Sequence, residues 1–144
     1  MKKIYITASE KETETVASEL AKALEPGSVV CMYGDLGAGK TAFARGIAAG
    51  LGIDEPVTSP TFTIINEYEG ALPLYHFDVY RAGGSEGMAE TGFDEYFYGD
   101  GVCVVEWAEL IEDILPDDTI DVTIKRLPDK GDDCREIVIT CNGE

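Results

Sequence analysis

Residues 34–41 read Gly34-Asp35-Leu36-Gly37-Ala38-Gly39-Lys40-Thr41, a full match to the phosphate-binding loop pattern G-x-x-x-x-G-K-[ST]. The apolar run at 29–33 before this loop is typical of a buried strand. After the loop, Phe43, Ile47 and Leu51 recur at every fourth position and predict one apolar face of a helix. A strand, a glycine-rich loop and a helix in this order aim backbone N–H groups at polyphosphate. A glycine-rich turn with a chance lysine accounts for less of the pattern, so we predict a nucleotide-binding protein.

The chain is strongly acidic: 11 Lys and Arg residues against 28 Asp and Glu residues give a net charge of −17. Autonomous nucleic-acid binding rests on neutralisation of phosphates by basic residues, so this composition argues against it. The acids are spread along the chain, and most are expected to form a solvated surface. Binding of an anionic nucleotide therefore depends on local groups. We expect the Lys40 ammonium group to reach the β- and γ-phosphates and the Thr41 hydroxyl to hold a magnesium ion.

Length and apolar content predict one globular domain over residues 1–144. A chain of 144 residues most simply forms one domain, and 44% apolar residues are typical of a protein with a core. No apolar run approaches the roughly 20 residues that span a bilayer, and residues 1–7 lack the apolar segment of a signal peptide. We therefore expect a cytoplasmic protein with no membrane association.

The four cysteines, Cys31, Cys103, Cys134 and Cys141, show no C-x-x-C spacing. Cys31 and Cys103 lie within apolar runs, where a free thiol behaves as a small core hydrophobe. Reduced structural thiols are therefore the favoured interpretation, with a zinc site or a disulfide as the alternatives.

The remaining pattern predicts a three-layer α/β fold of the P-loop NTPase type, with a mixed, partly antiparallel central sheet and a C-terminal β-hairpin. Ser9 and Glu12 form a capping box that opens the first helix. The other expected elements are a strand at 3–7, an apolar stripe of the first helix at Val16, Leu20 and Leu24, strands at 64–68 and 74–80, a glycine-rich and mobile segment at 82–92, a buried strand at 102–105, a short helix at 110–115, and a hairpin with strands at 120–124 and 137–139 around a turn at 129–133.

Two acids qualify as the second catalytic group of a nucleotide triphosphatase. Glu106 directly follows the buried strand at 102–105, although aspartate is more usual at that place. A glutamate there could contact magnesium directly, hold it through water or orient the attacking water. Asp78 is the other candidate, because His76, Asp78 and Tyr80 share one face of the strand at 74–80. The sequence does not decide which of the two acids touches the metal.

Four other residues near these acids each allow two interpretations. His76 is the only histidine, and we favour a structural or interface role because no nucleophilic Ser or Cys motif lies near it. Ser59 and Thr61 stand where a γ-phosphate-sensing switch commonly lies, or form an ordinary Ser-Pro turn. Trp107 follows the candidate acid and belongs either to the core or to a contact surface.

Four motifs together resemble one family. The phosphate-binding loop is followed by Ser59-Pro60-Thr61-Phe62, by Tyr75-His76-Phe77-Asp78-Val79-Tyr80-Arg81 and by Val105-Glu106-Trp107. In this order, over residues 34–107, they resemble the TsaE (formerly YjeE) family, the ATPase subunit of the bacterial tRNA threonylcarbamoyladenosine synthase. The N-terminal strand and helix and the C-terminal hairpin fit the family in size and carry weaker signatures.

This resemblance implies binding of ATP and Mg²⁺, slow ATP hydrolysis that depends on partners, and association with two subunits of the TsaD and TsaB type. Those partners transfer threonylcarbamoyl to the adenosine beside the tRNA anticodon, and the ATPase resets the complex between turnovers. By motif, Lys40, Asp78 and Glu106 would be catalytic, and Thr41 with Glu106 would hold the metal. The nucleotide would be bound by Asp35, Leu36, Gly37, Ala38, Gly39, Lys40, Thr41 and Ala42, with Glu10 on the adenine side by placement alone.

Two other functions fit a phosphate-binding loop. A stand-alone small-molecule or nucleoside kinase usually has an arginine-rich lid, whereas the arginines here, Arg45, Arg81, Arg126 and Arg135, form no such cluster in the sequence. A GTP-dependent switch would carry the guanine-selecting Asn-Lys-x-Asp motif, which the sequence lacks. An ATPase that works with partner proteins is therefore the preferred prediction, and the kinase is the alternative.

Overall fold

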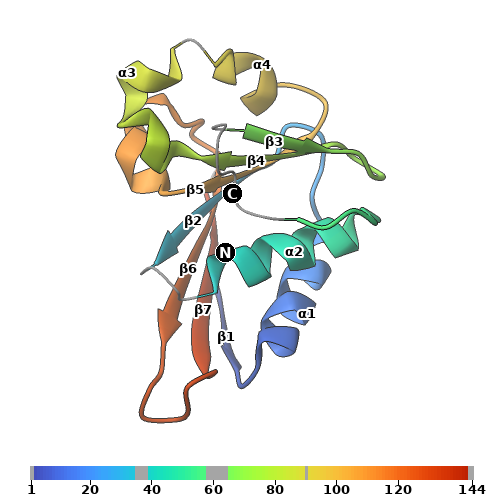
Figure 1. Cartoon of the computed structure of the whole chain (residues 1–144), viewed down its shortest axis with the longest axis vertical. Helices are drawn as coiled ribbons and strands as arrows, with labels where there is room; N and C mark the ends of the chain where they lie inside the picture. Colours follow the sequence, from blue (N-terminus) through green and yellow to red (C-terminus); the bar gives the residue numbers. More distant parts are fainter. Residues whose placement is uncertain (1, 35–38, 58–64, 90, 143–144) are drawn as a thin grey trace.

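The computed structural model of the chain describes residues 2–34, 39–57, 65–89 and 91–142, and within them seven strands form one sheet (Figure 1). The strand order is β1-β7-β6-β2-β5-β4-β3. The strands are β1 (Lys2–Thr7), β2 (Val29–Gly34), β3 (Ile65–Tyr68), β4 (Leu74–Asp78), β5 (Val102–Glu106), β6 (Ile120–Arg126) and β7 (Arg135–Cys141). The central strands β6, β2, β5 and β4 run parallel, and β1, β7 and β3 are antiparallel to their neighbours. The predicted mixed sheet and C-terminal hairpin are confirmed.

Helices cover both faces of the sheet, so the predicted three layers are also confirmed. On one side lie α1 (Glu10–Ala21) and α2 (Lys40–Gly50), packed against each other (Figure 1). On the other side lie the short segments η1 (Val79–Ala82), α3 (Ser85–Met88), α4 (Phe93–Phe97) and η2 (Ala108–Ile114). Among the described residues, no helix has both the length and the apolar character needed to span a bilayer.

Helix α1 begins with the predicted cap, but its buried face differs from the prediction. The Ser9 side chain accepts a hydrogen bond from the Glu12 amide at 3.1 Å, and Glu12 Oε1 accepts one from the Ala8 amide at 3.0 Å. This confirms the capping box, with the return bond displaced by one residue. The fully buried side of the helix is offset from the predicted stripe of Val16, Leu20 and Leu24. Its buried residues are Thr13, Ala17 and Ala21, whereas Val16 and Leu20 are partly buried and Leu24 lies beyond the helix end.

Small side chains on α1 meet glycines on α2. A Cβ atom on Gly46 would stand 2.3 Å from the Glu14 carbonyl oxygen and 2.6 Å from the Cβ of Ala17. Because only hydrogen fits there, the two backbones approach closely, and this contact fixes α2 against α1. The adjoining face of α2 carries Phe43 and Ile47, which are fully buried as predicted.

The second face of the sheet has its own core. Phe77 and Val105 from the sheet pack there with Met88, Phe97 and Ile111 from the covering segments, and all five are fully buried. The predicted mobile segment at 82–92 therefore contains a helical turn, α3, anchored by Met88. The predicted helix at 110–115 is a 3₁₀ segment that begins earlier, at Ala108, and has a kink at Ile111.

Strand β4 ends at Asp78 and not at Tyr80 as predicted. The Asp78 carboxylate accepts a hydrogen bond from the Tyr80 amide at 3.1 Å and caps η1, so the backbone turns away from the sheet at this point. The predicted strand at 64–68 is seen as β3 from Ile65, and residues 58–64 lie outside the described part of the chain.

The parallel centre of the sheet positions the candidate site. Because β2, β4 and β5 run in the same direction, their carboxyl ends meet at one edge of the sheet. The start of α2 lies at that edge, since Lys40 contacts Gly34 at the end of β2. Ligands of open α/β folds bind outside the carboxyl ends of the strands. Cys31 and Cys103 lie in the middle of these strands and are buried, as predicted.

Candidate functional site

A cavity of about 470 Å³ lies at this edge of the sheet, and it collects residues from segments far apart in the sequence. Its walls come from α1, the start of α2, the ends of β4 and β5, and the β6–β7 hairpin. The lining residues are Glu10, Thr13, Gly39, Lys40, Thr41, Ala42, Arg45, Asp78, Glu106, Trp107, Asp133 and Arg135. All the predicted site residues that the structure describes therefore line one cavity. Asp35, Leu36, Gly37 and Ala38 lie outside the described residues, as do Ser59 and Thr61.

The Lys40 side chain is held at the base of this cavity. Its Nζ donates a hydrogen bond to the Gly34 carbonyl oxygen at 3.0 Å and lies 4.1 Å from the centre of the Trp107 ring. The residue is only 5% exposed. A buried ammonium group at the start of a helix provides positive charge where helix N–H groups point outward. The position therefore suits an anion such as a phosphate group.

Trp107 takes an unusual backbone conformation to reach Lys40. It has φ 63° and ψ 36°, and it is the only non-glycine residue with positive φ in the ranges that the structure describes. Bulky residues rarely adopt the left-handed region, and such strain clusters at functional sites. The turn lies directly after Glu106, and it packs the indole against Tyr80 with ring centres 5.1 Å apart. Trp107 therefore belongs to the wall of the cavity, which the sequence had left undecided.

The two candidate acids lie side by side. Asp78 and Glu106 are partners in the β4–β5 register, and both line the cavity. Glu106 is 5% exposed, whereas Asp78 is half-buried. Thr41, in the first turn of α2, brings a hydroxyl to the same cavity. Carboxylate and hydroxyl oxygens are the ligands that Mg²⁺ prefers, usually with phosphate oxygens completing its shell. The donor set therefore fits magnesium.

The structure brings a further side chain to Glu106. The Nε2 atom of His76 lies 2.6 Å from Glu106 Oε2, and the imidazole is fully buried. The sequence favoured a structural or interface role for this histidine and gave it no contact with the site. The sequence carried one signal for this contact, the strand face that His76 shares with Asp78. The β4–β5 register, which sets His76 beside Val104, two residues before Glu106, comes only from the structure.

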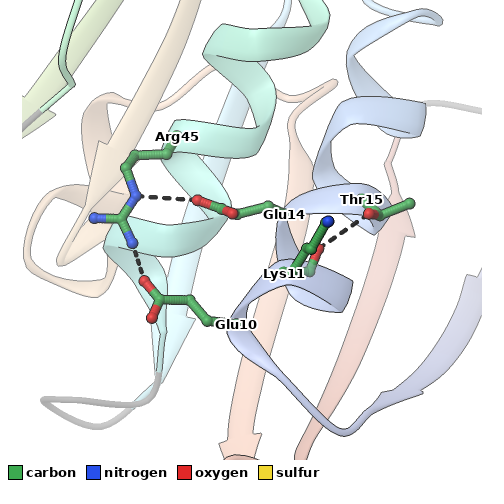
Figure 2. Close-up of polar contacts among 5 residues, drawn as sticks. All are labelled: Glu10, Lys11, Glu14, Thr15 and Arg45. Atoms are coloured by element: carbon green, nitrogen blue, oxygen red, sulfur yellow. Dashed lines mark hydrogen bonds and ion pairs between the residues drawn. The ribbon is translucent and has the colours of Figure 1, made fainter.

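At the rim of the cavity, Arg45 joins α2 to α1 (Figure 2). Its Nε donates to Glu14 Oε1 at 3.1 Å, and its terminal nitrogen pairs with the carboxylate of Glu10. The Arg45 side chain is 38% exposed, and such pairs contribute at most about 1 kcal/mol to stability. Glu10 thus lies at the cavity, where the resemblance placed it, and its carboxylate is engaged by Arg45.

The β6–β7 hairpin supplies two lining residues that the sequence did not reveal, Asp133 and Arg135. The Nη1 atom of Arg135 donates to the carbonyl oxygens of Asp132 at 2.7 Å and Cys134 at 2.9 Å, which orients the guanidinium group. No local sequence pattern identifies these two residues, because they reach the cavity only through the pairing of the hairpin with β2.

Glu109 adds negative charge near the lysine. Burial raises the pKa of its carboxyl, and the neighbouring Lys40 acts in the opposite direction. The lining of the cavity itself carries both signs of charge. Its cationic side chains are Lys40, Arg45 and Arg135 and its carboxylates include Glu10, Asp78 and Glu106, a combination that suits an anion bound together with a cation.

Comparison with known proteins agrees with this geometry. The sequence model of the family described as "Threonylcarbamoyl adenosine biosynthesis protein TsaE" matches residues 7–137. A Bacillus subtilis (strain 168) protein named "tRNA threonylcarbamoyladenosine biosynthesis protein TsaE" is 52% identical over 138 residues, which cover 95% of this chain and 84% of that protein. The protein of the same name from Treponema pallidum (strain Nichols) is 43% identical over 134 residues, 93% of this chain and 97% of that protein.

A solved structure is similar over nearly the whole chain. The crystal structure of YdiB from Bacillus subtilis superimposes with a TM-score of 0.82 at 48% sequence identity, and it covers 99% of this chain and 87% of that one. Sequence and fold agree over the same residues that build the cavity, and the chain belongs to the TsaE family.

Proposed function

We propose that this chain binds ATP with Mg²⁺ in the cavity and hydrolyses it slowly, as the ATPase component of tRNA threonylcarbamoyladenosine biosynthesis. The observation that carries the proposal is the meeting of Lys40, Asp78 and Glu106 in one cavity at the start of α2. Family membership supplies the pathway, because the relatives are named for it. The seven-stranded sheet that runs through the described residues supports a single domain over residues 1–144.

The residues would divide the work as their positions suggest. Residues 35–42 would bind the phosphates, with Lys40 turning its Nζ from the Gly34 carbonyl oxygen toward the β- and γ-phosphates. Thr41 and Glu106 would hold Mg²⁺, which when bound neutralises charge that develops on the transferred phosphoryl group. Asp78, beside Glu106 in the register, would support hydrolysis by orienting the attacking water. Glu10 would lie on the adenine side, with Arg45 fixing its carboxylate.

The charge of the chain supports a division of labour with partners. At −17, the protein is a poor ligand for tRNA by itself, whereas it can dock on a protein. We infer that subunits of the TsaD and TsaB type bind the RNA and transfer the threonylcarbamoyl group in the cytoplasm. ATP hydrolysis by this chain would reset the complex between turnovers.

Reconstitution tests this function. ATP hydrolysis and formation of threonylcarbamoyladenosine in tRNA would be measured for this chain alone, for the two partner subunits alone, and for the mixture. We expect hydrolysis to rise with the partners and repeated tRNA modification to require all three. A preference for GTP, or phosphate transfer to a small acceptor without the partners, would instead support a switch or the stand-alone kinase, although the relatives do not favour a kinase.

A further inference from the structure

His76 is a fully buried polar residue on β4, the strand next to the edge strand β3. It lies on β4 between β3 and β5, opposite Asn66 on one side and Val104 on the other. Its strand neighbours Tyr75 and Phe77 face the second core, so the imidazole faces α1 and α2, as do Asp78 and Glu106. Its Nε2 lies 2.6 Å from Glu106 Oε2. A hydrophobic residue would suit this place better if packing were the only requirement.

The contact has a direct consequence for Glu106. A glutamate side chain has three rotatable bonds, and a single short hydrogen bond to a fixed imidazole restricts them. It engages one carboxylate oxygen and leaves the other available as a ligand. The imidazole is itself fixed, because His76 has no exposed surface and its strand pairs with a neighbour on each side. Within the described residues, its Nδ1 atom has no hydrogen-bond partner, so Nε2 makes the contact that accounts for a buried imidazole.

We propose that His76 is a positioning residue, whose Nε2–H holds the Glu106 carboxylate in the orientation needed for the cation and the attacking water. The inference rests on the proposed function, since it assigns His76 a role in that same site. It predicts that the imidazole carries a proton on Nε2, because a carboxylate can only accept. It also predicts that His76 acts through Glu106 and has little effect where Glu106 is absent.

The first test uses the protein without nucleotide. His76 is the only histidine, so its two ring nitrogens give unambiguous signals in a long-range ¹H–¹⁵N correlation spectrum. We expect a proton on Nε2 in the wild type, and a changed Nε2 signal in Glu106→Ala. A neutral ring protonated only on Nδ1 would overturn the proposal, because Nε2 would then have no hydrogen to donate.

The second test uses a matched pair of variants. In His76→Gln the amide nitrogen reaches about as far as Nε2, whereas in His76→Asn it reaches only as far as Nδ1. We expect His76→Asn to lower kcat at least tenfold and to weaken ATP binding severalfold with Mg²⁺ but less than twofold without it. His76→Gln should recover most of both losses. Equal kcat values for the two variants would contradict the proposal.

A double-mutant cycle separates positioning from general structural damage. His76→Asn should lower kcat much less in a Glu106→Ala background than in the wild type, because Glu106→Ala already removes the carboxylate that His76 holds. Phe77→Leu is the control for damage to β4, since Phe77 neighbours His76 and faces the opposite core. Thermal unfolding would be measured for all variants. If Phe77→Leu, at an equal loss of stability, lowers kcat as much as His76→Asn, the role of His76 is structural only.

Failure of the positioning role can be distinguished from failure of the proposed function. If the wild type shows no Mg²⁺-dependent binding of ATP, the function fails whatever the histidine spectrum shows. If the wild type binds and hydrolyses ATP, and His76→Asn does the same within twofold, only the positioning role fails.

Discussion

The ammonium group of Lys40 lies over the ring of Trp107, 4.1 Å from the ring centre, while it donates to the Gly34 carbonyl oxygen. A cation over an indole is attracted by the negative face of the ring. These two contacts hold the lysine inside the cavity before any ligand arrives. Because phosphate oxygens accept stronger hydrogen bonds than a neutral carbonyl, a bound nucleotide can take the ammonium group over.

Trp107 therefore offers a test of the strained turn after β5. In both Trp107→Ala and Trp107→Gly the indole is lost, but only glycine adopts positive φ without steric cost. We expect the glycine variant to be more stable than the alanine variant by about 1 kcal/mol in urea unfolding. Equal stabilities, or a more stable alanine variant, would show that the turn at φ 63° is not maintained in solution.

Glu106→Gln tests the candidate acid. The amide keeps the size of the side chain but removes its charge, so ATP hydrolysis should fall far more than ATP binding. Single-turnover hydrolysis and equilibrium binding would be compared in the same buffer, with Glu112→Gln on η2 as a control that should match the wild type. Wild-type turnover by Glu106→Gln would move the metal role to Asp78, its register partner.

The contact between α1 and α2 is tested by Gly46→Ala. Helix propensity alone would make this substitution stabilising by about 1 kcal/mol. Here the new methyl group would stand 2.3 Å from the Glu14 carbonyl oxygen, so we expect a net loss of about 1–3 kcal/mol in the free energy of unfolding. Urea unfolding gives the sign of the change in the free energy of unfolding. A stabilised variant would contradict the close approach of the two helices.

We predict that the two buried thiols make the folded protein less stable at alkaline pH. Burial raises the pKa of Cys31 and of Cys103 to about 12, against about 8.5 in an unfolded chain. Between these values the unfolded chain releases protons that the folded chain keeps. Each thiol should therefore lower the free energy of unfolding by up to about 1.4 kcal/mol per pH unit, with no effect below the lower value.

This pH dependence can be measured by urea unfolding at a series of pH values from about 8 to about 11. Replacing both Cys31 and Cys103 by alanine should make the slope shallower in that range. A double variant with the same slope as the wild type would show that the two thiols titrate normally in the folded protein.

Local patterns in the sequence predicted the parts of the fold that depend on neighbouring residues. The strand before the phosphate-binding pattern, the helix after it with Phe43 and Ile47 on its buried face, and the Ser9 cap were all predicted, because periodicity and capping act over a few positions. The buried face of α1 was not predicted correctly. Thr13 and Ala17 are buried because they are small enough to pack closely against α2, and hydrophobic periodicity carries no information on that close packing.

In the candidate site, too, the residues marked by local patterns were predicted, and those placed by strand pairing were not. Lys40, Asp78 and Glu106 stand next to strong local signals, and the cavity contains all three. Arg135 lies 95 residues after Lys40 in the sequence. It is part of β7, and the pairing of β7 with β6 and of β6 with β2 brings it to the cavity. The contact of His76 with Glu106 depends in the same way on the β4–β5 register, which no local pattern specifies.

Binding of the ATP triphosphate at Lys40 is tested by calorimetric titration of Mg²⁺–ATP into the wild type and Lys40→Ala. Loss of charge-assisted hydrogen bonds should cost about 1.5–3 kcal/mol, so we predict an affinity roughly 10–100-fold weaker. Lys22→Ala, at an exposed position on α1's C-terminal end, should bind as the wild type does. A folded Lys40→Ala protein that binds ATP with unchanged affinity would show that the triphosphate does not bind at Lys40.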